Sequence, residues 1–120
     1  LQKLKDTCDE HDHLTHVESL GDGRQATWHN TQRAPGDDVA VRQAVNAIVR
    51  DQQPVIINEL YDGFGQKAHS PINPSMKFWH NADATVFDGG VPQATEILKD
   101  AGYVWDEDGN IYYPEGKTGR

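Results

Sequence analysis

Residues 28–46 read WHNTQRAPGDDVAVRQAVN and carry the clearest structural signal in the chain. Ala34-Pro35-Gly36 interrupts any regular element, and Asp37 or Asp38 then stands where a side chain can cap the first turn of a helix. In the helix that follows, four apolar residues fall on one face: Val41, Val45, Ile48 and Val49. The stretch therefore predicts a capped amphipathic helix with these four apolar residues on one face.

Three further segments also predict helices. Residues 1–12 begin with Leu1, Leu4 and Cys8 at helical spacing, which is typical of the last part of a helix. Pro54 and Pro92 each suit the first turn of a helix, and glycines at 63 and 102 suit the ends of the same two helices. The first of these has apolar Val55, Ile56, Leu60 and Tyr61, and the second is expected to turn Ala94, Ile97, Leu98 and Ala101 inward.

Two pairs of short strands are expected around glycine-rich turns. Residues 13–18 and 24–30 contain β-branched or aromatic members and flank Gly21-Asp22-Gly23, so they predict two neighbouring strands. Residues 103–105 and 111–113 flank Asp108-Gly109 and predict a small hairpin. Between the helices, residues 64–90 lose periodicity and predict a long ordered loop of the kind that is functional or laid over another surface.

The composition indicates one domain with little material for a core. Leu, Ile, Val and Phe supply 24 of 120 residues, which is at the border where highly charged chains stop folding alone. The net charge of −8, without a basic cluster, argues against nucleic-acid binding. The longest apolar runs, such as Val55-Ile56-Ile57, are too short to span a membrane. Cys8 is the single cysteine, so no internal disulfide can form.

A zinc site at the histidines is the alternative to a binding role. His11, His13 and His16 lie within six residues, and the run is similar to the His-x-His-x-Asp-His signature of zinc-dependent hydrolases of the metallo-β-lactamase type. Thr15 stands where that signature needs its acid, and no suitable downstream ligands follow. Surface histidines are therefore the favoured interpretation, and a small zinc-binding module or hydrolase is the alternative.

No other motif predicts a cofactor or a catalytic residue. Residues 104–115 partly match a calcium loop, but Val104 occupies the first ligand position, so a hairpin turn explains the run better. The serines lie in no Gly-x-Ser-x-Gly elbow, and Cys8 lies beside acids rather than beside the basic groups that activate a thiol. We expect no enzyme, no catalytic residue, no metal and no cofactor.

Five pieces of the chain resemble, in order, the extracellular solute-binding proteins of family 5. The family has a strand ending in Asn-Thr before a helix that begins Asp-Val-x-Val-Arg-Gln-Ala, and residues 28–31 and 38–44 are similar to these. Residues 63–75 are similar to its Gly-Tyr-Gly … Ser-Pro-Ile-x-Pro loop, residues 94–103 to a helix end with Ala-Gly-Tyr, and residues 106–111 to a hairpin. Arg50-Asp51 reverses the Asp-Arg that is usual after the first helix. The run 30–35 and the loop favour the dipeptide and oligopeptide branch, although nickel binders share this scaffold.

The resemblance implies a fold of α+β class, an α/β-type lobe like those of type II periplasmic binding proteins, with about three helices and a few short strands. Complete members are several times longer and have two lobes that close on the ligand. Residues 1–120 are then expected to be a single domain, an excised part of the second, ligand-binding lobe. Some apolar surface, around residues 64–90 and the three tryptophans, is expected to lie against the rest of the parent protein.

The implied function is the capture of peptides, dipeptides or oligopeptides, outside the cell for delivery to the permease subunits of an ABC importer. The expected partners are the peptide, the permease and the remaining lobe, with no nucleic acid. The expected location is extracellular or periplasmic, with any membrane anchor in the full-length parent. The ligand-cleft candidates are Trp28 and Asn30 at a strand end and Ser70, Ile72, Asn73 and Met76 in the loop. The alternative for each is that it only packs the loop onto its own lobe.

Overall fold

Four helices and one pair of strands make up the regular structure of the computed structural model, which describes residues 2–19, 21, 23–68 and 70–117. The helices are α1 (Gln2–Asp9), α2 (Val39–Asp51), α3 (Gln53–Tyr61) and α4 (Gly90–Asp100), and the strands are β1 (Val104–Trp105) and β2 (Ile111–Tyr112). Mixed α and β character is confirmed, with one helix more than the resemblance implies. Leu1 and Asp22, which belong to the predicted first helix and first turn, lie outside the described residues. Within the described ranges, no helix is long and apolar enough to cross a membrane.

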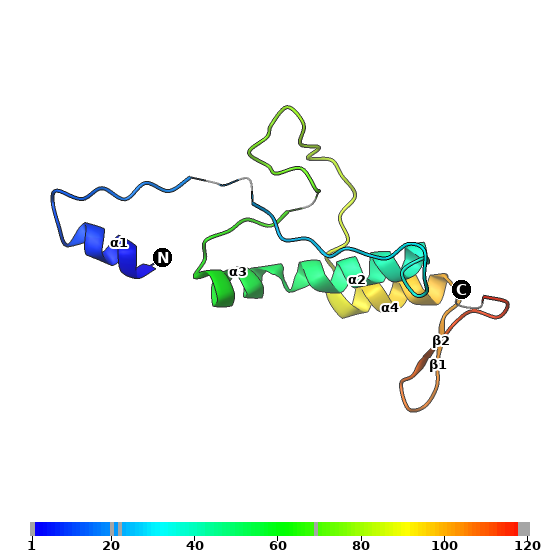
Figure 1. The fold of residues 1–120 in the computed structure, drawn as a ribbon. Coiled ribbons are helices and arrows are strands. Elements are labelled where there is room, and N and C mark those ends of the chain that lie inside the picture. The colour runs from blue at the N-terminus through cyan, green and yellow to red at the C-terminus, as the bar shows by residue number, and fades with distance from the viewer. Residues whose placement is uncertain (1, 20, 22, 69, 118–120) are drawn as a thin grey trace.

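Helices α2 and α4 lie side by side and form the centre of the fold, whereas α1 lies apart at one end (Figure 1). The core between them consists of Ala44 and Ala47 of α2 and Ala94 of α4. Phe87, Ile97 and Leu98 pack around these alanines and are only partly buried. The four apolar residues predicted to share one face of α2, Val41, Val45, Ile48 and Val49, are therefore not its buried residues. Alanine forms the contact because its small side chain lets two helix backbones approach closely, and the valines and Ile48 remain partly or largely exposed.

The two ends of α2 carry the signals that the sequence predicts. The Oδ1 atom of Asp38 accepts a hydrogen bond of 3.0 Å from the backbone N–H of Ala40, so Asp38 is the N-cap. Gln52 separates α2 from α3, and Pro54 lies in the first turn of α3 as expected. At the end of α3 the first left-handed residue is Asp62, with φ of 50°, and Gly63 follows it at 80°. Helix α4 begins at Gly90, two residues before the predicted Pro92.

The predicted hairpin is confirmed, whereas the predicted strand pair near the N-terminus is wrong. β1 and β2 are antiparallel, with Val104 opposite Tyr112 and Trp105 opposite Ile111. The described parts of 13–18 and 24–30 run without any strand assignment, and no backbone–backbone hydrogen bond involves residues 23–29 in the described chain. An isolated pair of strands is marginal in water unless a third strand or a helix packs against it. The loop over 64–89 has no regular element among its described residues, as expected.

The chain buries few apolar side chains and is extended. The buried hydrophobic residues in the described ranges are the three core alanines and Tyr103. The radius of gyration is 19.6 Å, whereas a compact domain of this length has one of about 14 Å. The expectation of a thin core is confirmed, and large apolar side chains remain on the surface.

The carboxylate of Asp38 joins three parts of the chain that are distant in sequence. Besides capping α2, its Oδ2 accepts hydrogen bonds of 2.7 Å from the hydroxyl of Tyr103 and from the ammonium of Lys117. The Asp38 side chain is 12% exposed. The hydrogen bond from Lys117 lowers the pKa of Asp38 against the opposing effect of burial, and the bonds from Tyr103 and Ala40 lower it further. Burial, together with the hydrogen bond to Asp38, raises the pKa of Tyr103.

Replacing Ala47 by leucine tests the helix contact. Ala47 is fully buried between α2 and α4, and adding three carbons there forces the helices apart at a cost of about 1 to 3 kcal/mol. The matched control, Glu96→Leu, places the same side chain on the exposed side of α4 and should change the free energy of unfolding by less than about 0.5 kcal/mol. Urea denaturation followed by circular dichroism measures both. Equal effects of the two substitutions would show that Ala47 is not a contact point.

Replacing Asp38 by asparagine tests the triple hydrogen bond and its pH dependence. The loss of a charged acceptor for Tyr103 and Lys117 should lower the free energy of unfolding by about 1 to 3 kcal/mol at neutral pH. The pKa of Asp38 is lower in the folded chain than in the unfolded one, so the folded state binds fewer protons at this site. The contribution of Asp38 to the free energy of unfolding is therefore complete above about pH 5. It is lost as the pH falls through the lowered pKa. Asp37→Asn, at the exposed neighbour, is the control, and an Asp38→Asn effect that stayed constant down to about pH 2 would contradict the assignment.

Candidate functional site

A shallow hollow of about 450 Å³ lies between the segment that precedes α2 and the first half of α2. The segment contributes residues 27–30 and 33–36, and the helix contributes Val41 and Val45. The two valines, from the predicted apolar face of this helix, thus form an apolar floor that remains open to solvent. Both candidate residues of this segment, Trp28 and Asn30, line the hollow.

The backbone around the hollow is held by short-range hydrogen bonds. Asn30 Oδ1 accepts a hydrogen bond of 3.0 Å from the backbone N–H of Gln32. Arg42 Nη1 donates to the carbonyl oxygens of Gly36, at 2.7 Å, and of Asp37, at 2.9 Å. A Cβ atom at Gly36 would lie 2.5 Å from the carbonyl oxygen of Asn30, so only glycine allows the chain to fold back this closely. The segment that carries Trp28 and Asn30 is therefore ordered at its junction with α2.

The hollow offers both an aromatic surface and polar groups with unused hydrogen-bonding capacity. The Trp28 side chain is 82% exposed, so its indole is free for contact. His29 Nε2 is buried and has no hydrogen-bond partner in the described chain. His29 is a site residue that the sequence prediction missed, because in a strand it would point to the face opposite Trp28 and Asn30. The irregular path of the segment instead brings consecutive residues to the same hollow.

The four loop candidates do not line this hollow, and most of their polar groups hold the loop together. Ser70 Oγ donates to the carbonyl of Ile72 and accepts from its N–H, both at 3.0 Å. Asn73 Oδ1 accepts from the N–H of Ser75 at 2.9 Å. Met76 is 40% exposed. The structure therefore brings Trp28 and Asn30 together, and it places the loop candidates elsewhere.

The loop docks on the extended segment that leads to the hollow. Asn73 Nδ2 donates a hydrogen bond of 2.7 Å to the carbonyl of Gly21. The guanidinium of Arg24 donates to the carbonyl of Pro71. Residues about 50 positions apart in sequence are joined in this way. The residues to which the loop is joined, Gly21 and Arg24, and the segment that lines the hollow thus lie in one stretch of chain, residues 21–36.

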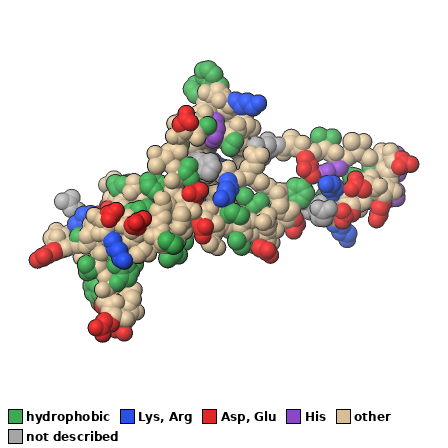
Figure 2. Space-filling view, turned by 180° about the vertical axis from the view of Figure 1, so that it is seen from behind, with side chains coloured by type: hydrophobic (Ala, Val, Ile, Leu, Met, Phe, Trp, Pro, Cys, Tyr) green, Lys and Arg blue, Asp and Glu red, His purple; other side chains and the backbone are tan. Residues whose placement is uncertain are grey.

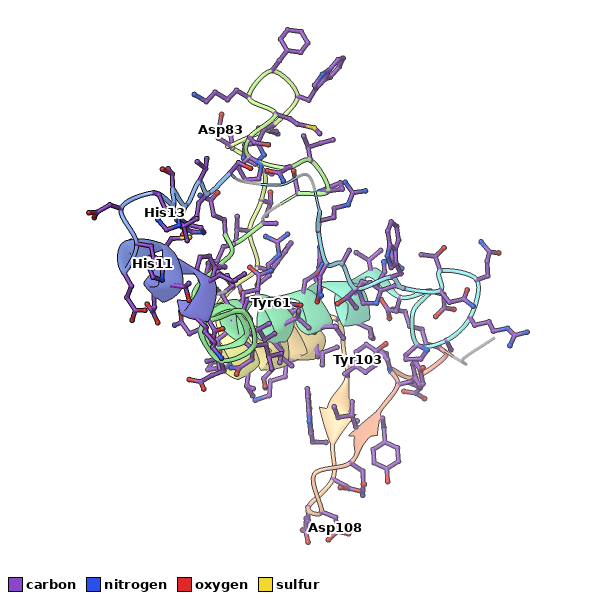
Figure 3. The ribbon with its side chains drawn as sticks, turned by 60° about the vertical axis from the view of Figure 1, so that its left-hand side comes forward. His11, His13, Tyr61, Asp83, Tyr103 and Asp108 are labelled. Atoms are coloured by element: carbon purple, nitrogen blue, oxygen red, sulfur yellow. The ribbon has the colours of Figure 1, made fainter. Side chains whose placement is uncertain are left out.

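The three histidines of the zinc alternative do not converge. The rings of His11 and His13 lie 5.6 Å apart between centroids, just after α1 (Figure 3). His16 Nδ1 lies 3.5 Å from Glu18 Oε1 instead. Among the described residues, no three His, Cys, Asp or Glu side chains are placed to hold a metal ion. This geometry offers no tetrahedral ligand set of the kind that zinc takes.

Asp106 serves the hairpin turn. Its Oδ1 accepts from the N–H groups of Asp108 and Asn110, and its Oδ2 accepts from the Asn110 amide and the Tyr112 hydroxyl, at 2.8 to 3.0 Å. The hydrogen bonds from Asn110, with that from Tyr112, lower the pKa of Asp106. The hairpin interpretation of this stretch is confirmed, since the carboxylate is committed to protein donors.

Comparison with known proteins agrees with the resemblance drawn from the sequence. The profile of the bacterial extracellular solute-binding proteins, family 5 Middle, matches residues 4–119. The chain is 36% identical over 75 residues to heme-binding protein A of Haemophilus influenzae, and 36% identical over 74 residues to the dipeptide-binding protein of Escherichia coli. Each match covers 62% of this chain and 13% of the relative. A search of solved structures found no match. Because the family profile covers nearly the whole chain, the protein belongs to family 5 of the bacterial extracellular solute-binding proteins.

Proposed function

We propose that the protein acts as the substrate-binding component of an ABC importer and captures peptides, dipeptides or oligopeptides, on the outer side of the cell membrane. The observation that carries this proposal is the family match over residues 4–119. The role is one of binding and release, without catalysis, and the partners are the peptide, a second lobe and the permease subunits. The extracellular or periplasmic location follows from the same membership.

The hollow beside Trp28 supplies the chemistry that such a role needs. A peptide combines apolar side chains with a polar backbone, and sites for small ligands combine aromatic walls with a few placed polar groups. The exposed indole of Trp28 suits an apolar side chain, whereas the amide of Asn30, which also lines the hollow, suits backbone carbonyl or N–H groups. The hollow is shallow, so a second surface closing over it would be needed to exclude water from the ligand.

Haem is the competing ligand class, since one relative is named for it and another for dipeptides. The sequence runs NTQRAP, at 30–35, and SPINP, at 70–74, favour the dipeptide and oligopeptide branch. Ser70 and Asn73 support this role indirectly. Ser70 forms a hydrogen bond within the loop, and Asn73 joins the loop to Gly21, in the segment that leads to Trp28. We therefore propose peptides as the ligand.

Calorimetric titration of the protein expressed from its complete gene, with dipeptides and tripeptides, tests the proposal. We expect a dissociation constant in the micromolar range or tighter, and a loss of about ten-fold or more in Trp28→Ala, because truncating a buried aromatic contact costs more than about 1 kcal/mol. Val104→Ala, at an exposed residue of the hairpin, is the control and should leave affinity unchanged. Residues 1–120 alone should bind weakly or not at all, since their hollow is open on one side.

Two outcomes would count against the peptide proposal. Tight binding of haem, seen as a shifted absorption band, without any peptide binding would assign the other ligand class. Peptide binding that is equally strong in the native protein and in Trp28→Ala would place the ligand away from the hollow.

A further inference from the structure

The hollow beside Trp28 is lined without an acidic residue, although the chain as a whole is acidic. The chain contains 19 Asp and Glu residues against 11 Lys and Arg residues, and acidic side chains are scattered over the surface as far as the tip of the hairpin (Figure 2). The described residues that line the hollow include no Asp or Glu, and Arg33 carries their one permanent charge. The hollow therefore favours an anionic group over a cationic one.

Arg33 has a guanidinium without a partner. The residue is exposed and, in the part of the chain that the structure describes, its side chain forms no hydrogen bond and no ion pair. Arg42, by contrast, donates to the carbonyl oxygen of Gly36 at 2.7 Å, which places a second positive charge at the edge of the hollow. A guanidinium is always charged and has five N–H donors. Arg33 thus keeps its donors for a ligand.

The backbone of Arg33 is held at the rim of the hollow. Its N–H donates to the carbonyl oxygen of Asn30 at 3.5 Å, and its own carbonyl oxygen accepts from the N–H of Asp37 at 3.1 Å. These bonds close the turn between the segment of Trp28 and α2. The arginine stem therefore starts from a fixed point beside the hollow, and its flexible side chain can reach a ligand seated against Trp28.

The two aspartates that follow this turn do not neutralise Arg33. The carboxylate of Asp38 is already bonded to the ammonium of Lys117. Asp37 does not line the hollow, and no ion pair joins it to Arg33 among the described residues. The charges beside the hollow are then Arg33 and Arg42 against Asp37, and their balance is positive.

We propose that Arg33 is a specificity residue that binds a carboxylate of the peptide while Trp28 contacts a neighbouring apolar side chain. A guanidinium matches a carboxylate with two parallel N–H···O hydrogen bonds, which an ammonium cannot form. The carboxylate belongs either to the C-terminus of the peptide or to an acidic side chain. The inference rests on the proposed function, because an exposed ion pair contributes little and becomes stronger when a second surface excludes water.

Calorimetric titration of the protein expressed from its complete gene, with three dipeptide probes, tests the inference. Ala-Phe has a free C-terminal carboxylate, Ala-Phe amide has no carboxylate, and Glu-Phe amide has one on its side chain only. We expect Ala-Phe or Glu-Phe amide to bind about ten-fold or more tightly than Ala-Phe amide. A preference for Ala-Phe assigns the terminal carboxylate, and a preference for Glu-Phe amide assigns the side chain.

Variants at two basic positions show whether this preference comes from Arg33. Arg33→Gln should reduce the preference to about one-fold, and Arg33→Lys, which keeps the charge without the paired donors, should retain part of it. The matched control is Lys67→Gln, which removes one positive charge from an exposed residue outside the hollow and should keep the native preference. Circular dichroism verifies that each variant is folded.

The outcomes separate this inference from the proposed function. Equal binding of all three peptides by the native protein, or an unchanged preference in Arg33→Gln, would overturn the role of Arg33 and leave peptide capture intact. Failure of the native protein to bind any of the three peptides would overturn both proposals.

Discussion

The contact between the alanines of α2 and α4 is the constraint on which the rest of the structure depends. Ala44, Ala47 and Ala94 let the two helices lie side by side, and no larger side chain in the described chain is fully buried. The helices connect at both ends, through the Asp38 carboxylate to Tyr103 at one end and through Asp51, close to Gly90, at the other. The segment with Trp28 leads into α2, and the loop that docks on this segment leads into α4, so the helix pair positions both.

Local signals in the sequence predict the elements of the fold because their causes are local. Asp38 caps α2 through an atom two residues away, and Gly102 ends the turn after α4 with φ of 87°. The inner face of α2 is not predictable in this way, since it depends on which side α4 covers. A hydrophobicity pattern favours Val45 and Ile48 as the buried residues of α2, whereas close packing of the two helices favours the smaller alanines.

The pairing of strands and the geometry of the hollow depend on distant parts of the chain, so the sequence predicts them less well. Residues 24–30 have the composition of a strand, but a strand requires a partner, and these residues have no backbone partner in the described chain. Trp28 and Asn30 both line the hollow, because they lie next to the turn that leads into α2. His29 was missed because the strand prediction placed it on the opposite face.

Within the described residues, no backbone–backbone hydrogen bond involves residues 23–29, and this affects how the segment can bind a ligand. This segment is held at its beginning by the loop, through Gly21 and Arg24, and at its end by the turn that contains Gly36. The segment is therefore ordered by contacts at its two ends and not by backbone hydrogen bonds along its length. Under the proposed function, a ligand seated against Trp28 restricts the same segment that anchors the loop, so ligand binding and loop order stabilise each other by linkage. The loop is then coupled to the hollow through its hydrogen bonds to Gly21 and Arg24.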